Sequence, residues 1–183
     1  MNKHIATSVI LALGVWTAGG CDSGSKNATP GSPGAAAAAL PSTLFLKSAP
    51  ANPKDVCDVV ESAKPGESVF VRGVIGGSVD PFVNHRAIMT IADRKMKSCE
   101  DMGGEDHCKT PWDYCCEPRD SLKVKLASVQ IVGPDGKVLK SDLKGQGELN
   151  PSRRVVVEGK VAPESTKDSL VINATGVFVE PKG

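Results

Sequence analysis

The chain has 183 residues with 22 basic and 21 acidic side chains, so its formal net charge at pH 7 is only +1. A general nucleic-acid-binding protein usually carries a basic excess, and this even balance argues against such a partner. The length leaves room for one core of ordinary size and too little for two comfortable domains.

The first 20 residues have the plan of an export signal. Lys3 and His4 precede an apolar run, 5–18, that is shorter than the roughly 20 residues a helix needs to cross a bilayer. We therefore interpret residues 1–20 as a cleavable signal peptide, which places the remainder of the chain outside the cytoplasm.

The end of this signal carries a further feature. The stretch Ala18-Gly19-Gly20-Cys21 resembles the lipobox that bacterial lipoprotein signal peptidase recognises. The resemblance implies cleavage before Cys21, lipid on its thiol and attachment of the protein to a membrane of the bacterial cell envelope. An ordinary secretory signal is the alternative, and it also places the protein outside the cytoplasm.

Residues 21–43 are expected to form a flexible linker. They are rich in Gly, Ser, Pro and Ala, include five consecutive alanines at 35–39, and contain almost no large apolar side chain. Such a composition buries too little surface to offset the entropy of ordering the chain. The folded domain is therefore predicted to span residues 44–183.

The first half of this domain is expected to hold one short helix and two strands. Val56, Val59 and Val60 have helical spacing within 52–63, and Pro53 suits a first helical turn. Residues 69–75 alternate in polarity as a half-buried strand does, and 87–92 is a plausible second strand.

The second half is expected to be β-structure. Apolar residues alternate with lysines from 122 to 126 and then change parity, so we interpret 122–132 as one long strand with a β-bulge. Gly133-Pro134-Asp135-Gly136 is a strong turn signal. Residues 155–161 repeat the V-x-V-x-G pattern of the first strand with its glycine facing inward, and 170–179 forms a final strand.

Five strands of this spacing resemble the oligonucleotide/oligosaccharide-binding barrel, the OB-fold. The predicted fold is thus mainly all-β: a small five-stranded OB-like barrel with a short N-terminal helix. A small β-sandwich is the alternative, although it would need about seven strands. The helix that usually lies between the third and fourth OB strands is not expected here, because 140–152 has the composition of a loop.

A cysteine-rich insertion is predicted between the second and third strands, at about 94–120. It includes Pro111-Trp112-Asp113-Tyr114-Cys115-Cys116, a stretch that resembles one found in uncharacterised envelope lipoproteins, with no activity implied. A loop of this length needs some brace other than a hydrophobic core. The candidates for disulfide bonds or metal binding are Cys57, Cys99, Cys108, Cys115 and Cys116.

Two kinds of brace remain open. Disulfides are the default in an oxidising compartment, and the adjacent Cys115 and Cys116 are expected to have different partners because a bond between neighbours is strained. Alternatively, Cys99, Cys108, Cys115 and Cys116 with His107 supply the sulfur and nitrogen ligands that Zn²⁺ prefers. No cofactor is firmly implied, and Zn is the candidate. The sequence has no C-x-x-C, which disfavours a thioredoxin-like centre and c-type haem.

Aromatic residues make up only 4% of the chain, yet Trp112 and Tyr114 lie beside the cysteines. In OB-type sites such side chains stack on bases or sugar rings. A binding face is therefore predicted from Arg72, Phe82, His85, Arg86, Trp112 and Tyr114. The alternative is that the aromatic pair forms a miniature core for the insertion.

Catalysis finds no support in the sequence, and we expect that the protein is not an enzyme. After the signal there are only two histidines, and no G-x-S-x-G elbow or phosphate-binding glycine loop occurs. Three hypotheses remain. The first is an envelope binding module with a protein or glycan partner, the second a Zn- or Cu-binding protein, and the third a structural surface lipoprotein.

Overall fold

A computed structural model describes residues 39–99, 101–102 and 109–182. The chain divides into two units, Met1–Gly34 and Ala35–Gly183, and all described residues belong to the second. The predicted signal peptide and Cys21 lie outside the described residues. Within the described part, no helix has the length and apolar character that crossing a membrane requires.

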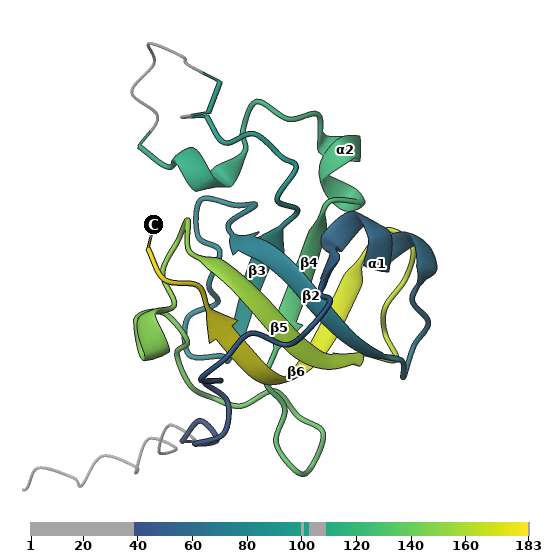
Figure 1. The fold of residues 1–183 in the computed structure, drawn as a ribbon, viewed down its shortest axis with the longest axis vertical. Coiled ribbons are helices and arrows are strands. Elements are labelled where there is room, and N and C mark those ends of the chain that lie inside the picture. The colour runs from purple at the N-terminus through teal and green to yellow at the C-terminus, as the bar shows by residue number, and fades with distance from the viewer. Residues whose placement is uncertain (1–38, 100, 103–108, 183) are drawn as a thin grey trace, which may run out of the picture. The chain divides into compact units, whose positions relative to one another are not determined.

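Five strands form one closed barrel (Figure 1). They are β2 (Ser68–Ile75), β3 (Ile88–Ala92), β4 (Leu126–Gln130), β5 (Arg154–Val161) and β6 (Leu170–Val179). The order is β2-β3-β4-β6-β5, and β5 pairs back with β2. Only β4 and β6 are parallel in this ring. The predicted OB-like barrel is confirmed, and the β-sandwich alternative is excluded because one sheet closes on itself.

The barrel interior is filled by the inward-facing residues of each strand. Exposed and buried positions alternate along β2 from Ser68 to Val71, as the period-two pattern predicted. Gly159 faces inward on β5, where a Cβ atom would overlap the backbone of β6 at Asn173 and Ala174. The register of β5 with β6 shifts between Glu158 and Gly159, so this close approach coincides with a bulge that bends the barrel wall.

The predicted long strand 122–132 is wrong in its first half. Residues Arg119–Lys123 form the short helix α2, and β4 begins only at Leu126. Leu122 and Leu126 are four residues apart, a spacing that suits one helical face as well as one strand face. Both pack against the same small apolar cluster. The change of parity in the sequence therefore marks the junction of helix and strand, not a bulge.

The predicted helix at 52–63 exists but is shorter. The helix α1 spans Val56–Ser62, because the two preceding residues form β1 (Lys54–Asp55), which pairs in parallel with β2. Val56 and Val59 are buried against the barrel. The described residues also form two 3-10 turns, η1 (Pro111–Asp113) and η2 (Gln146–Glu148). The connection from β4 to β5 contains η2 as its one helical turn, as expected for a loop.

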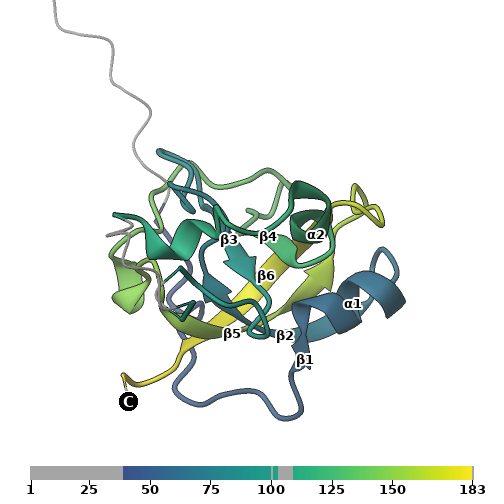
Figure 2. The ribbon, with the colours of Figure 1, turned by 90° about the horizontal axis from the view of Figure 1, so that it is seen from above.

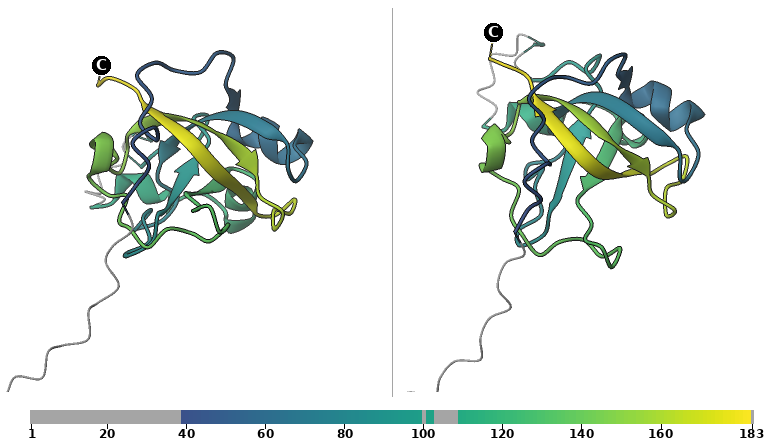
Figure 3. Two further views of the ribbon diagram at one scale, coloured as in Figure 1. Left: turned by 90° about the horizontal axis from the view of Figure 1, so that it is seen from below. Right: turned by 60° about the horizontal axis from the view of Figure 1, so that its bottom comes forward.

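The segment that enters the domain is fixed to the last strand (Figure 3). Val177 donates its backbone N–H to the Leu44 carbonyl at 2.6 Å, and the Leu46 N–H donates to the Val177 carbonyl at 2.9 Å. Leu44 itself is buried in the main core. Leu40, within the predicted linker, also packs against this core, so the contacts of the folded domain begin before residue 44.

A buried carboxylate joins β1 to β2. Asp55 accepts a hydrogen bond from Arg72 Nε at 2.5 Å and forms an ion pair with Lys95 Nζ at 3.1 Å. The hydrogen bond from Arg72 holds the pKa of Asp55 below its ordinary value, even though burial acts in the opposite direction. Arg72, a member of the predicted binding face, is therefore committed to a structural ion pair.

We expect the Asp55→Asn variant to lose about 1–3 kcal/mol of unfolding free energy at pH 7, because the buried side chain loses its charge-assisted hydrogen bond from Arg72 and its ion pair with Lys95. A lowered folded-state pKa stabilises the protein above the unfolded value of about 3.9, and the contribution is lost as pH falls through the folded value. Urea denaturation should therefore show the wild type and variant converging below about pH 4. Asp58→Asn, at an exposed site on α1, is the control; an equal loss in both variants, or one independent of pH, would contradict the argument.

Candidate functional site

The cysteine-rich insertion connects β3 to β4 and lies over one end of the barrel (Figure 2). Its beginning is fixed by Asp93, whose carboxylate is fully buried. Asp93 accepts hydrogen bonds from the backbone N–H of Cys57 at 2.9 Å and of Lys95 at 2.8 Å. The first residue of the insertion is thereby joined to α1.

A second anchor lies at the loop that follows β2. The Gly77 N–H donates to the Trp112 carbonyl at 2.8 Å, and Trp112 Nε1 donates to the Val79 carbonyl at 3.0 Å. A Cβ atom on Gly76 would lie 2.5 Å from the Trp112 carbonyl oxygen. Only glycine at position 76 allows the insertion to approach this closely, so the Gly76-Gly77 pair is a docking site for Trp112.

The third anchor is the side chain of Tyr114. It is 2% exposed and packs with Ala92 and Met96 in a cluster separate from the main core. This arrangement matches the alternative in which an aromatic residue forms a miniature core for the insertion. The prediction that Tyr114 belongs to an exposed binding face is wrong, because its ring closes the base of the insertion.

The other members of the predicted face do not form one surface. Phe82 is buried in the main core and forms a bridge with Met89, so its predicted exposure is also wrong. His85 and Arg86 are exposed, and the His85 backbone N–H is held by Asp142 Oδ1 at 2.6 Å. A sequence of alternating polarity identifies strands, but it does not show which loop aromatics turn into the core.

The chain turns sharply after Tyr114, which has a left-handed backbone with φ of 54°. Asp113 Oδ1 accepts the Cys115 N–H at 2.9 Å, and the Glu117 N–H donates to the Tyr114 carbonyl at 2.9 Å. This turn directs the thiols of Cys115 and Cys116 to the same side. The expectation that the adjacent cysteines have different partners stays a prediction, because Cys108 lies outside the described residues.

Three thiols converge at this turn. The Sγ atoms of Cys99 and Cys115 are 3.6 Å apart, and those of Cys115 and Cys116 are 3.9 Å apart. All three sulfurs lie within 4.8 Å of one another. A disulfide bond has an S–S distance of about 2.05 Å. Tetrahedral Zn²⁺ with Zn–S bonds of about 2.3 Å places its sulfurs about 3.8 Å apart, close to the distances in this cluster.

The remaining predicted ligands have different positions. His107 and Cys108 lie outside the described residues. Cys57 is on α1 beside Asp93, and burial, followed by Asp93, raises the pKa of its thiol to about 11. Among the residues that the structure describes, the one group of three or more possible metal ligands is Cys99, Cys115 and Cys116.

The surroundings of Cys115 favour its protonated form when no cation is bound. Hydrogen bonding with Cys99, reinforced by Asp113, raises the pKa of Cys115 to about 11. A metal ion binds the thiolate, so it must displace this proton. Cys115 and Cys116 are exposed and Cys99 is partly exposed, so an ion can reach the sulfurs from solvent.

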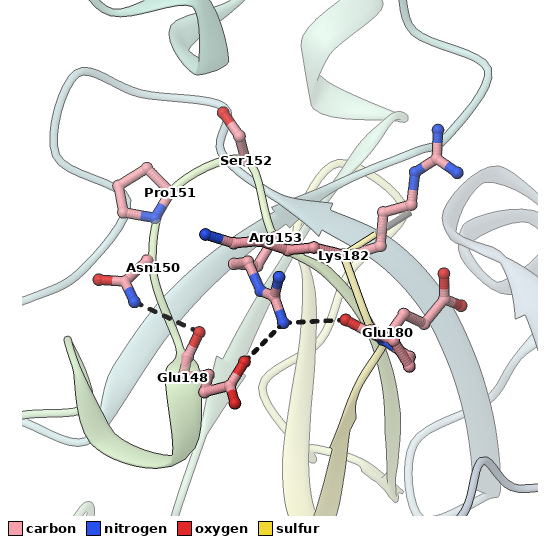
Figure 4. A pocket seen from close by; sticks show the side chains of 9 residues that line it. Glu148, Asn150, Pro151, Ser152, Arg153, Glu180 and Lys182 are labelled. Atoms are coloured by element: carbon pink, nitrogen blue, oxygen red, sulfur yellow. Dashed lines mark hydrogen bonds and ion pairs between the residues drawn. The ribbon is translucent and has the colours of Figure 1, made fainter.

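An arginine-rich region that sequence reasoning missed lies beside the insertion. The Arg153 side chain is 9% exposed, and its Nη2 donates to Glu148 Oε2 at 2.8 Å and to the Glu180 carbonyl at 2.9 Å (Figure 4). Arg94 forms an ion pair with the Glu180 side chain. The consecutive arginines 153 and 154 at the start of a strand were the available signal, because neighbours on a strand point to opposite faces.

Comparisons of the chain with protein-family models, with curated proteins and with solved structures find no match. The site must therefore be interpreted from its own geometry.

We expect Gly76→Ala to displace the insertion, because the added methyl group overlaps the Trp112 carbonyl. This variant and its control both carry Trp16→Phe, so that Trp112 is the one tryptophan even in a chain that retains the signal peptide. In Gly76→Ala, the emission of Trp112 should become more readily quenched by acrylamide while the far-UV β signal persists. Val79→Ala, in the same loop and at an exposed side chain, is the matched control. Unchanged quenching in Gly76→Ala would show that this contact does not position the insertion.

Proposed function

We propose that this chain is an envelope protein, tethered to a membrane by lipid on Cys21, whose insertion binds Zn²⁺ through the thiolates of Cys99, Cys115 and Cys116. The observation that carries the proposal is the convergence of three sulfurs at separations of 3.6 and 3.9 Å for the two measured pairs. Sulfur ligands at this spacing suit tetrahedral zinc. Cu(I) also prefers thiolates and is the second candidate ion.

A zinc ion accounts for the cluster better than a disulfide does. A bond between Cys99 and Cys115 would join only two of the three converging sulfurs. A cation uses all three, and structural zinc sites take a fourth ligand. His107 and Cys108 were predicted as ligands from the sequence, and that prediction stays open. Bound metal would brace an insertion that is long for a compact domain.

One further observation favours the binding-module hypothesis as a second candidate. A pocket of about 300 Å³ lies against β3 and β4, bordered by Gly77 and the residues before β6. OB-folds bind oligonucleotides or oligosaccharides at the corresponding strands and loops. Arg119 and Lys123 of α2 contribute to its wall, so the insertion helps to shape this site as well. An envelope glycan or protein is the partner expected from the proposed location.

The first test is metal content together with thiol reactivity, on protein isolated from an oxidising compartment without chelator. We expect one equivalent of zinc per chain and thiols that react with a disulfide reagent only after the metal is chelated. Cys99→Ser, Cys115→Ser and Cys116→Ser should each lower zinc affinity by at least about tenfold. Cys57→Ser, on α1 and outside the cluster, is the control and should retain full stoichiometry.

Two results would contradict the metal site. One is protein without metal in which mass spectrometry finds Cys99, Cys115 or Cys116 in a disulfide. The other is an equal effect of Cys57→Ser and Cys115→Ser on zinc affinity, since only the second residue belongs to the cluster.

Membrane attachment is tested separately. We expect the wild-type protein to sediment with bacterial membranes and to incorporate labelled fatty acid, because several acyl chains bind a bilayer almost irreversibly. Cys21→Ser should abolish labelling and release the protein from the membrane fraction. Labelling that persists in Cys21→Ser would disprove the lipidation site and leave the metal site unaffected.

A further inference from the structure

We propose that a pocket between the insertion and the start of β5 binds a small organic anion, and that zinc in the cysteine cluster strengthens this binding. The anion site stands on its own residues, whereas its coupling to zinc rests on the proposed metal site. This pocket shares no lining residue with the pocket against β3 and β4 described above, and none of the three clustered cysteines lines it.

The pocket has a volume of about 470 Å³, which is in the range of small-molecule sites. The insertion forms one wall and the barrel the other. The polar groups that matter for binding are Arg94, Ser98, Asp101, Ser152 and Arg154, and Trp112 also lines the space. A ligand here would touch segments that are far apart in the sequence.

Two guanidinium groups make this pocket suited to an oxyanion. The guanidinium group of Arg154 forms no hydrogen bond or salt bridge with a described residue, although its backbone carbonyl accepts the Glu180 N–H at 2.9 Å. Arg94 pairs with Glu180, but its Nε is buried without a hydrogen-bond partner. A carboxylate or phosphate accepts hydrogen bonds from a guanidinium group such as that of Arg154, and charge-assisted bonds of this kind are roughly twice as strong as neutral ones.

The one acidic side chain that lines the pocket is already engaged. Asp101 accepts hydrogen bonds from the Ser98 N–H at 2.9 Å and the Ser98 hydroxyl at 2.7 Å. These hydrogen bonds from Ser98 lower the pKa of Asp101, and the charge of Arg154 lowers it further without a hydrogen bond between the two side chains. The adjoining pocket, which shares Ser152 and Arg154, adds the cation of Lys182 (Figure 4). The adjoining pocket is also lined by Arg153 and by the carboxylates of Glu148 and Glu180. The two linings together hold four cationic side chains and three carboxylates, so a net positive charge of one remains for an anion.

The coupling follows from the order of residues along the insertion. Ser98 lines the pocket and Cys99 comes next; Tyr114 lines it and Cys115 comes next. An ion bound by both thiolates fixes these two wall segments relative to each other. The two wall segments are also joined by the hydrogen bond from the Cys99 N–H to the Pro111 carbonyl at 3.4 Å and by the packing of Met96 against Tyr114. Fixing the walls in advance removes an ordering cost from ligand binding and raises affinity.

The experiment is calorimetric titration of the full chain, zinc-loaded and metal-free, with glucuronate, glucose 6-phosphate and uncharged glucose. We expect at least one anion to bind, glucose not to bind, and zinc to raise the anion affinity by about fivefold or more. Arg154→Gln should weaken anion binding by about tenfold. Lys160→Gln, an exposed cation on the same strand, is the matched control and should change nothing.

The two anions distinguish the chemistry: binding of glucuronate alone assigns a carboxylate ligand, and binding of glucose 6-phosphate alone assigns a phosphate ligand. Absence of binding by both, or equal loss in Arg154→Gln and Lys160→Gln, overturns the pocket. Stoichiometric zinc with identical anion affinity in both forms overturns the coupling and leaves the metal site standing. If zinc does not bind, the proposed function and the coupling fail together, and the Arg154→Gln comparison in metal-free protein decides the pocket alone.

Discussion

The pairing of β2 with β5 closes the barrel, and the placement of every functional group depends on that closure. Seven residue pairs, from Ser68 with Lys160 to Val74 with Arg154, join the first and fourth barrel strands. Without this ladder the sheet would have two open edges and no fixed interior. Closure also fixes the ends of β3 and β4, between which the insertion begins and ends.

The insertion is held to this frame by contacts that involve the backbone more than apolar side chains. Asp93 fixes its start, the Gly76-Gly77 pair receives Trp112, and Tyr114 fills a small cluster below it. The left-handed backbone of Tyr114 lets one residue enter the protein while the next two present their thiols outward. The same local geometry thus anchors the segment and exposes its chemistry.

The strands of the barrel could be predicted because alternation of polarity reports directly on burial at β2 and β5. The site could not be predicted in the same way. The exposure of Phe82 and Tyr114 depends on loop conformations that carry no periodic signal. The convergence of Cys115 and Cys116 depends on the positive φ of Tyr114, a conformation uncommon for a residue other than glycine. For residues 122–125, helix and strand patterns coincide over one turn, and length alone could not separate them.

The small size of the apolar cluster beneath the insertion bears on why thiols are gathered there. Of the residues that the structure describes, Ala92, Met96 and Tyr114 are buried in it, whereas the main core draws on all five barrel strands. A segment with so few buried side chains opens more readily than the barrel that supports it, because local stability follows the density of buried contacts. A metal ion that joins Cys99 to Cys115 would connect the two ends of this segment and reduce such opening. The same connection spans the arginine-lined pocket, so bracing of the insertion and control of a ligand site would be two consequences of one ion.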